Sequence, residues 1–216
     1  MKGASLDELI EGLADELEPI TPRRVTRGSL MVAVGWVGAA ALLLGLLGLR
    51  GDLARGVMLP PLPMLAFWLI AAVALAAIWS GLRMGLPGVG RDYNGWRWAG
   101  IAAMALPLSA LFTGMEDSHA AMASVRHGID TPCLAQALLA GLGVGASLFL
   151  WLRGGAPTSP TRAAWVIGIA AGASGAAIVA LHCPIDDLVH IALWHGLAIP
   201  LSGAAGRLLL PSFLRW

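Results

Sequence analysis

Six long stretches of the sequence contain no Asp, Glu, Lys or Arg, and this feature constrains the fold more than any other. They cover residues 28–49, 56–82, 98–115, 131–152, 163–185 and 188–206. A helix that crosses a bilayer needs about 20 apolar residues, within a range of about 17–25, and a charge inside the bilayer is costly. The second stretch is longer, but prolines crowd its start, so we expect its helix to begin near Pro63. The sequence therefore predicts an all-α, polytopic membrane bundle of six transmembrane helices.

The composition of the chain agrees with a membrane protein and excludes some other classes. Of the 216 residues, 57% are hydrophobic and 12% are charged, whereas a soluble domain carries about 25% charged residues. The formal net charge of +1 is too small to indicate direct binding to nucleic acid. The stretches hold few polar residues at depth, which argues against a pathway for ions or solutes.

Lys and Arg are distributed unevenly between the segments that join the six stretches. If the N-terminus is cytoplasmic, the inner segments carry 11 of the 14 basic residues, and the outer loops carry Arg50, Arg55 and Arg126. Basic residues concentrate on the cytoplasmic side of membrane proteins. We therefore expect a multi-pass protein of a bacterial inner membrane, surrounded by lipids, with both termini in the cytoplasm.

Small residues recur at four-residue spacing in two of the stretches. Gly141 and Gly145 form one pair, and Gly168 and Gly172 form the other. Glycines at this spacing let two helices approach closely. We expect them to pack helices of one chain together, with a contact between two copies as the alternative. In the third stretch, Pro107 predicts a kink.

The first 27 residues differ from the rest of the chain. Ser5 followed by Glu8 is a capping box, which predicts a helix that starts at Ser5. Acidic residues occupy one face of this helix, and prolines at 19 and 22 end it. Apolar residues recur on the other face at helical spacing, namely Leu6, Leu9, Ile10, Leu13 and Leu17. The sequence predicts a short, acidic amphipathic helix on the cytosolic side.

Three roles are open for this amphipathic helix. It is a solvated leader without a partner, it lies flat on the membrane, or it docks its leucine stripe into a groove of a cytosolic protein. Anionic lipids repel an acidic face. An isolated helix of this length is marginal in water, so a basic partner would order it on binding. Three arginines that follow are expected to contact the anionic inner leaflet: Arg23, Arg24 and Arg27.

Both cysteines fall at the outer boundary of the predicted bundle. Cys133 begins the fourth span, which runs inward, and Cys183 ends the fifth span, which runs outward. We therefore expect the two thiols to lie at the same depth. Three interpretations stay open: two small buried hydrophobic residues, a disulfide or dithiol switch, or a metal site that His182 completes with the cysteines.

Further polar residues lie on the same outer side. Asp186 and Asp187 are expected to cap the sixth span. His190 follows Asp186 by four residues, which predicts a structural Asp–His pair on one helix face. His195 lies five residues beyond His190, so an α-helix would point it elsewhere. A solvated loop is expected over the polar cluster of Glu116, Asp117 and His119.

Taken together, the chain resembles the NrsF family of membrane-bound anti-sigma factors. The resemblance rests on six spans, on one cysteine at each of two outer helix ends, and on three short motifs. These motifs are Leu9-Ile10-x-x-Leu13-x-Asp15-x-Leu17-x-Pro19, Thr131-Pro132-Cys133 and His182-Cys183-Pro184. Proteins of this family regulate extracytoplasmic-function (ECF) sigma factors.

The resemblance implies two parts with different roles. Residues 1–27 would be a cytosolic sigma-binding tail, in which Leu6, Leu9, Ile10, Leu13, Leu17 and Pro19 contact an ECF sigma factor. Residues 28–216 would be a transmembrane sensor, in which Cys133 and Cys183 detect a metal or an oxidant. No resident cofactor is implied, although a heavy-metal ion could bind the cysteine pair transiently.

Two other classes compete with this interpretation. A membrane thiol–disulfide oxidoreductase usually has a reactive Cys-x-x-Cys pair, whereas these two cysteines are 50 positions apart. A small metal-binding or transport protein would need ligands in the middle of the membrane. No nucleotide-binding, hydrolase or haem-attachment motif is present in the sequence. We therefore expect a regulator and not an enzyme, and the oligomeric state stays open.

Overall fold

The computed structural model describes residues 5–16, 23–86, 108, 111–112, 114–115, 118–130, 132–155 and 157–214. Within these ranges the chain forms helices and connecting segments and no strand. Five helices are long and apolar enough to cross a membrane. They are α2 (Val25–Leu47), α4 (Pro61–Met84), α7 (Cys133–Arg153), α8 (Pro160–Ala180) and a composite helix over Leu188–Leu209. The all-α prediction is confirmed for the described part of the chain.

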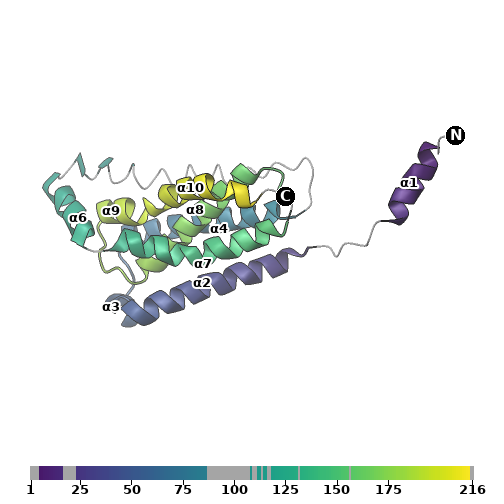
Figure 1. The fold of residues 1–216 in the computed structure, drawn as a ribbon. Helices are drawn as coiled ribbons and strands as arrows, with labels where there is room; N and C mark the ends of the chain where they lie inside the picture. Colours follow the sequence, from purple (N-terminus) through teal and green to yellow (C-terminus); the bar gives the residue numbers. More distant parts are fainter. Residues whose placement is uncertain are drawn as a thin grey trace.

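The shorter helices mark the two ends of the bundle. α3 (Gly51–Ala54), α6 (Ser118–Asp130) and α9 (Leu188–His190) lie together at one end, which we call the distal end (Figure 1). At the other end, the tail end, α2 begins and α7 finishes. α1 (Leu6–Asp15) lies beyond the tail end, apart from the bundle (Figure 1).

The last span is not a single regular helix. α9 passes into a π-helical turn, Ile191–His195, and then into α10 (Ala198–Leu209) and a 3-10 turn, Pro211–Phe213. π-helical turns are rare and are found mostly as single insertions in α-helices, often at functional sites. This interruption lies at the distal end and affects the site described below.

The third predicted span, 98–115, lies largely outside the described residues, as does Pro107. The six-helix count and the kink therefore stay predictions. The described residues on either side of this gap lie at opposite ends of the bundle. Gly85 lies beside Trp151 at the tail end, whereas α6 lies at the distal end, where Ser124 donates a hydrogen bond to Asp187.

The other predicted spans agree with the observed helices, with one difference that matters. The fifth span was predicted to reach residue 185, but α8 ends at Ala180. The backbone tightens there, because the N–H groups of Leu181 and His182 bond to carbonyl oxygens three residues earlier. Pro184 then prevents the helix from continuing. Cys183 therefore lies in the loop between α8 and α9 and not on the helix.

α8 forms the centre of the bundle. It packs against α4, α7 and α10, and most of its side chains are buried. Helices in lipid gain little from the hydrophobic effect, so close packing of small side chains has to hold them together. The sequence of α8 meets this requirement with its many Ala and Gly residues.

The paired glycines make these close contacts possible within one chain. A methyl group on Gly141 of α7 would overlap the carbonyl oxygen of Ala171 on α8. A methyl group on Gly168 of α8 would overlap the carbonyl oxygen of Ser202 on α10. The predicted intramolecular packing is therefore confirmed for both helices.

Candidate functional site

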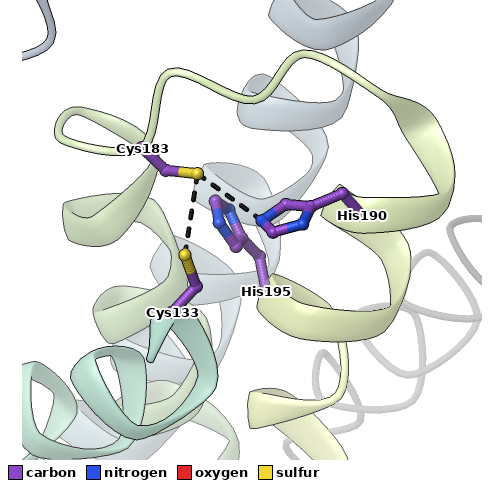
Figure 2. Close-up of side chains that lie close together, drawn as sticks. All are labelled: Cys133, Cys183, His190 and His195. Carbon is purple, nitrogen blue, oxygen red and sulfur yellow. Dashed lines mark hydrogen bonds between the residues drawn. The ribbon is translucent and has the colours of Figure 1, made fainter. Parts of the chain in front are cut away.

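Four side chains with metal-ligand chemistry meet inside the distal end of the bundle. They are Cys133, Cys183, His190 and His195, and Figure 2 shows that they point toward one another. One potential ligand atom from each residue lies within 4.8 Å of the others. All four residues are buried, with exposed fractions of 4% or less. We refer to them as the Cys–His cluster.

The two thiols are in direct contact. Cys133 is the first residue of α7 and follows Pro132, and its Sγ atom lies 3.7 Å from Sγ of Cys183. The sequence predicted only that the two thiols lie at the same depth, and the structure places them side by side. The hydrogen bond with Cys133 and burial raise the pKa of the Cys183 thiol. The Cys183 thiol is therefore harder to deprotonate than a free cysteine.

The two histidines complete the cluster. Nε2 of His190 lies 3.5 Å from Sγ of Cys183. The rings of His190 and His195 meet edge to face, with centroids 5.4 Å apart and an interplanar angle of 75°. His190 is fully buried and His195 is 1% exposed. Neither ring nitrogen of His195, nor Nδ1 of His190, has a hydrogen-bond partner in the described part of the chain.

The π-helical turn explains why His195 joins His190. The sequence interpretation that His195 points elsewhere assumed an α-helix and is wrong. Over Ile191–His195 the backbone forms π-type hydrogen bonds, such as that from the N–H of Gly196 to the carbonyl of Ile191, 2.8 Å long. This looser winding brings residues five positions apart to one face of the helix.

His182 does not join the cluster, although the sequence suggested it as a metal ligand. Its Nδ1 atom lies 2.9 Å from the carbonyl oxygen of Gly48, at the end of α2. The ring therefore attaches the loop of Cys183 to α2. The structure brings His190 and His195, and not His182, to the two cysteines.

The loop of Cys183 is also held by an ion-pair network around Arg50. The guanidinium of Arg50 donates hydrogen bonds to Asp52, at 2.6 and 2.7 Å, and to Asp186, at 2.8 and 3.0 Å. The hydrogen bonds from Arg50 lower the pKa of Asp52 to about 2, so Asp52 is ionised at physiological pH. The backbone N–H of Arg50 also donates to the carbonyl of Leu181.

The predicted pair between Asp186 and His190 is therefore wrong. Asp186 binds Arg50 instead, because it precedes the helix and points toward the turn after α2. The predicted cap is confirmed for Asp187, whose carboxylate accepts hydrogen bonds from the backbone N–H groups of Val189 and His190. This cap fixes the start of α9 and hence the position of His190.

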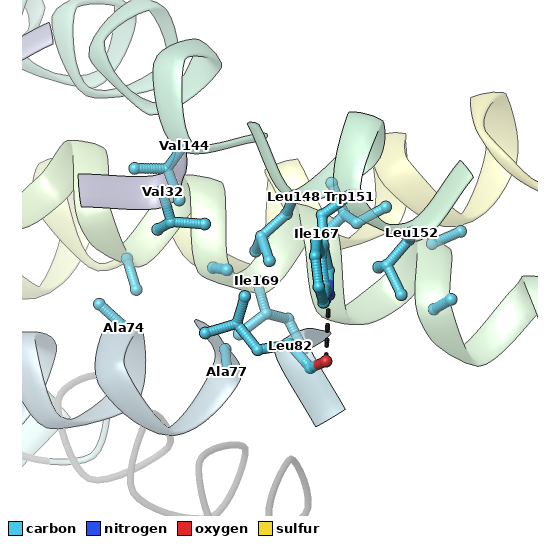
Figure 3. Close-up of a cluster of buried hydrophobic side chains, with 14 of the residues drawn as sticks. Val32, Ala74, Ala77, Leu82, Val144, Leu148, Trp151, Leu152, Ile167 and Ile169 are labelled. Atoms are coloured by element: carbon cyan, nitrogen blue, oxygen red, sulfur yellow. Dashed lines mark hydrogen bonds between the residues drawn. The ribbon is translucent and has the colours of Figure 1, made fainter. Parts of the chain in front are cut away.

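A second contact lies at the tail end of the bundle, at the point where the N-terminal tail joins α2, which we call the root of the tail. Nη2 of Arg23, just before α2, donates a 2.9 Å hydrogen bond to the carbonyl of Trp151 near the end of α7. The guanidinium also lies over the indole ring, 4.2 Å from its centroid. The indole in turn donates a 3.0 Å hydrogen bond to the carbonyl of Leu82 on α4 (Figure 3). Arg23 was expected to contact lipid, but it binds α7.

Comparison with known proteins shows the family of the chain. The family model NrsF, described as "Negative regulator of sigma F", matches residues 13–216. The chain belongs to the NrsF family. No solved structure matches the chain.

Two curated relatives support membership in the NrsF family over the full length of the chain. One is the "Anti-sigma-F factor NrsF" of Caulobacter vibrioides (strain NA1000 / CB15N), 32% identical, with 97% of this chain and 99% of the relative covered. The other is the "Probable anti-sigma-F factor NrsF" of Azospira oryzae (strain ATCC BAA-33 / DSM 13638 / PS), 30% identical, with both chains fully covered. These names describe regulators and not enzymes, which confirms the expectation from the sequence.

The predicted sigma-binding residues of this NrsF-family chain are only partly described. Leu6, Ile10 and Leu13 on α1 are exposed, at 73%, 55% and 57%. The side chain of Leu9 lies outside the described residues, as do Leu17 and Pro19. The apolar stripe is therefore accessible at the three positions where the structure describes it.

Sequence reasoning missed two parts of the site. The roles of His190 and His195 depend on a π-helical turn, for which the sequence Ile-Ala-Leu-Trp-His gave no local signal. The contact of Arg23 with Trp151 joins residues 128 positions apart. A tryptophan near the end of a span is usually explained by the membrane interface alone.

Proposed function

We propose that this chain is a membrane-anchored anti-sigma factor that holds an ECF sigma factor through its N-terminal tail. The observation that carries this proposal is the match to the NrsF family over residues 13–216. The exposed apolar stripe on α1 supports it, because an amphipathic helix with an unoccupied apolar face suits a groove on a partner protein. Its acidic face would favour a basic rim on the sigma factor.

The proposed topology places the tail and the Cys–His cluster on opposite sides of a bacterial inner membrane. With the N-terminus inside, the distal end faces the periplasm and the tail end faces the cytoplasm. The excess of Lys and Arg on the tail side supports this orientation. The cysteines would then lie close to an oxidising compartment, where either a disulfide or a dithiol can persist.

We extend the proposal to the detection of stress, in which Cys133 and Cys183 react with an oxidant or bind a cation. A two-electron oxidant would accept two electrons as the thiols lose two protons and form one S–S bond. A soft cation would instead displace the two thiol protons. A disulfide bond is about 2.05 Å long, so the sulfurs, now 3.7 Å apart, would have to approach. A disulfide would therefore draw the loop of Cys183 toward α7, whereas a cation would hold the two sulfurs near their present distance and fix the loop to α7.

Three contacts, at the two ends of the bundle, connect this movement to the tail. The loop of Cys183 is attached to the distal end of α2 through Arg50 and His182. The far end of α7, which begins at Cys133, is attached to the root of the tail through Trp151 and Arg23. A shift between α7 and α2 would therefore change the position of the tail.

The energy available from the two signals differs. A change from 99% bound to 99% free requires about 5.5 kcal/mol of differential stability. A disulfide typically contributes about 2–4 kcal/mol, whereas a structural zinc site contributes about 10–16 kcal/mol. Only the part of this energy that differs between the bound and released arrangements shifts the equilibrium, so a cation site has the larger reserve and a disulfide the smaller.

Co-purification tests the anti-sigma function. The full-length chain, expressed in its host and extracted in mild detergent, should carry a sigma factor of the ECF class. Leu13→Glu should remove it, because a charge in the apolar stripe cannot be buried in the groove. Gly12→Glu adds the same charge on the acidic face, where nothing lies within 4 Å of the new side chain, and should retain it. Retention by Leu13→Glu would contradict the proposed role of the tail.

A further inference from the structure

We propose that Cys133, Cys183, His190 and His195 form a four-ligand site for one soft or borderline divalent cation, such as Zn²⁺ or Cd²⁺. The two cysteines alone would supply only half of a tetrahedral ligand set, and the histidines supply the other half. The regulatory meaning of this site rests on the proposed function, whereas cation binding itself does not.

The distances in the cluster match a tetrahedral site. Zinc lies about 2.3 Å from a cysteine sulfur and about 2.0–2.1 Å from a histidine nitrogen. Tetrahedral angles then place two sulfurs about 3.8 Å apart and a sulfur and a nitrogen about 3.6 Å apart. The observed distances are 3.7 Å between the Sγ atoms of Cys133 and Cys183 and 3.5 Å between Sγ of Cys183 and Nε2 of His190. These two distances already suit a bound ion, whereas the cluster as a whole, whose ligand atoms lie within 4.8 Å of one another, would have to contract by up to about 1 Å.

The donor atoms select the class of cation. Two thiols and two imidazoles, with no carboxylate among them, suit Zn²⁺ and Cd²⁺, whereas Mg²⁺, Ca²⁺ and Mn²⁺ prefer oxygen ligands. Structural zinc sites use the same Cys₂His₂ set in a closed, four-coordinate form. The complete burial of the cluster agrees with a closed site and leaves no open position for catalysis.

The imidazole of His195 indicates a ligand independently of the distances. The ring is 1% exposed, and in the described part of the chain neither of its nitrogens forms a hydrogen bond of good geometry, although the thiol of Cys133 interacts with the ring. Buried polar atoms nearly always have a partner, so each exception requires an explanation. Coordination through one ring nitrogen of His195 would provide one.

There is room for a small ion beside the cluster. A cavity of about 20 Å³ is lined by Cys183, His195, Arg50 and Asp186, among other residues. A volume of about 10–15 Å³ or more holds one water molecule. The cavity reaches the ion-pair network at the distal end, so a cation could enter from that side.

The charges around the cluster also favour a cation. Arg50 brings one positive charge, but it is paired with two carboxylates, Asp52 and Asp186. When a divalent cation binds, each thiol releases one proton and the two imidazoles bind as neutral groups. The site with its ion is therefore neutral, and no buried charge is left uncompensated. No electron is transferred in this step.

X-ray absorption on the zinc-loaded chain tests the ligand set directly. The full-length protein is purified in detergent with a phosphine reductant, loaded with one equivalent of Zn²⁺ and freed of excess by gel filtration. We expect two sulfurs at about 2.3 Å and two nitrogens at about 2.0–2.1 Å. A shell with two sulfurs and two water oxygens, or the absence of bound zinc, would overturn the proposal.

Titration of single variants tests each histidine. In competition with a chromophoric chelator, we expect His190→Ala and His195→Ala to weaken Zn²⁺ and Cd²⁺ binding by about 10-fold or more, since even residues that only support a ligand contribute 10–100-fold. His119→Ala is the matched control, because this histidine is exposed on α6 and is not part of the cluster, and the affinity of this variant should stay at the wild-type value. Wild-type affinity in both cluster variants would show a site made of the cysteines alone.

The same samples separate this proposal from the proposed function. Retention of the sigma factor is measured in the ion-free protein, in parallel with cation binding. If the chain binds zinc through two sulfurs and two nitrogens but never retains a sigma factor, the proposed function is wrong and the site stands. If it retains the sigma factor but binds no cation, the site is wrong and the anti-sigma function stands.

Discussion

Arg23 lies with its guanidinium 4.2 Å from the centroid of the Trp151 ring and donates a 2.9 Å hydrogen bond to the carbonyl oxygen of the same residue. This contact joins the root of the N-terminal tail to the end of the helix that begins at Cys133. A cation–π contact is worth about 0.5–2 kcal/mol, enough to change the orientation of a short segment. It is therefore the part of the structure where movement of α7 would first reach the tail.

Removing this contact should uncouple the signal from the tail. With Arg23→Ala, we expect repression without stress to persist, because the apolar stripe on α1 is unchanged, and induction by cadmium to fall several-fold. A reporter for the sigma factor's own promoter measures both. Arg24→Ala removes the same charge from an exposed neighbour and should respond as the wild type does. Equal loss of induction in both variants would indicate a general effect of charge near the membrane.

Replacing both cysteines should remove the response to stress while leaving repression intact. Cys133→Ser with Cys183→Ser keeps two small side chains in place, but a hydroxyl is a poor ligand for soft cations and cannot form a disulfide. We expect the reporter to stay at its uninduced level with both cadmium and hypochlorite. Normal induction in the double variant would exclude the cysteines as the sensing pair.

The positions of the spans could be predicted because a helix that crosses a bilayer needs about 20 apolar residues without a charge among them. Charge-free length placed α2 and α4 within a few residues of their observed bounds. The same argument placed Cys133 and Cys183 at one depth, because the start of an inward helix and the end of the next outward helix share one boundary. Equal depth alone does not bring two side chains together, and their distance of 3.7 Å follows from the packing of α7 against α8.

The rest of the site could not be predicted, because it depends on irregular backbone and on contacts distant in sequence. An α-helix separates His190 and His195 by more than a quarter turn, and only the π-helical turn brings them together. Asp186 likewise binds Arg50 and not His190, because the turn after α2 brings Arg50 close to it in space. Local spacing favoured His190, and tertiary packing selected Arg50.

Arg50 should stabilise the distal end and transmit movement from the loop of Cys183. Arg50→Gln removes the hydrogen bonds to Asp52 and Asp186 and leaves two carboxylates without their cation. Hydrogen bonds to charged groups contribute about 1.5–3 kcal/mol in comparable sites. We expect a lower midpoint of thermal unfolding in detergent, followed by circular dichroism, and weaker induction in the reporter assay.

Arg55→Gln provides the control for that substitution. Arg55 lies five residues further along the same loop and is exposed, so its replacement should change stability by no more than about 0.5 kcal/mol. A similar loss of stability in Arg50→Gln and Arg55→Gln would mean that the ion-pair network does not hold the loop. The response to cadmium should then be equal in both variants as well.

The contact between α8 and α10 should depend on the absence of a side chain at Gly168. Gly168→Ala places a methyl group against the carbonyl oxygen of Ser202, so the helices have to separate, and overpacking of this kind costs about 1–3 kcal/mol. Gly45→Ala is the matched control on α2, where nothing lies within 4 Å of the added methyl group. Alanine is the better helix former by about 1 kcal/mol, so this control should leave the unfolding midpoint unchanged or raise it.

Because α10 continues the helix that carries His190 and His195, Gly168→Ala should also weaken cation binding, whereas Gly45→Ala should not. Thermal unfolding and zinc titration of the two variants, made side by side, would test whether the packing of α8 holds the cluster in place.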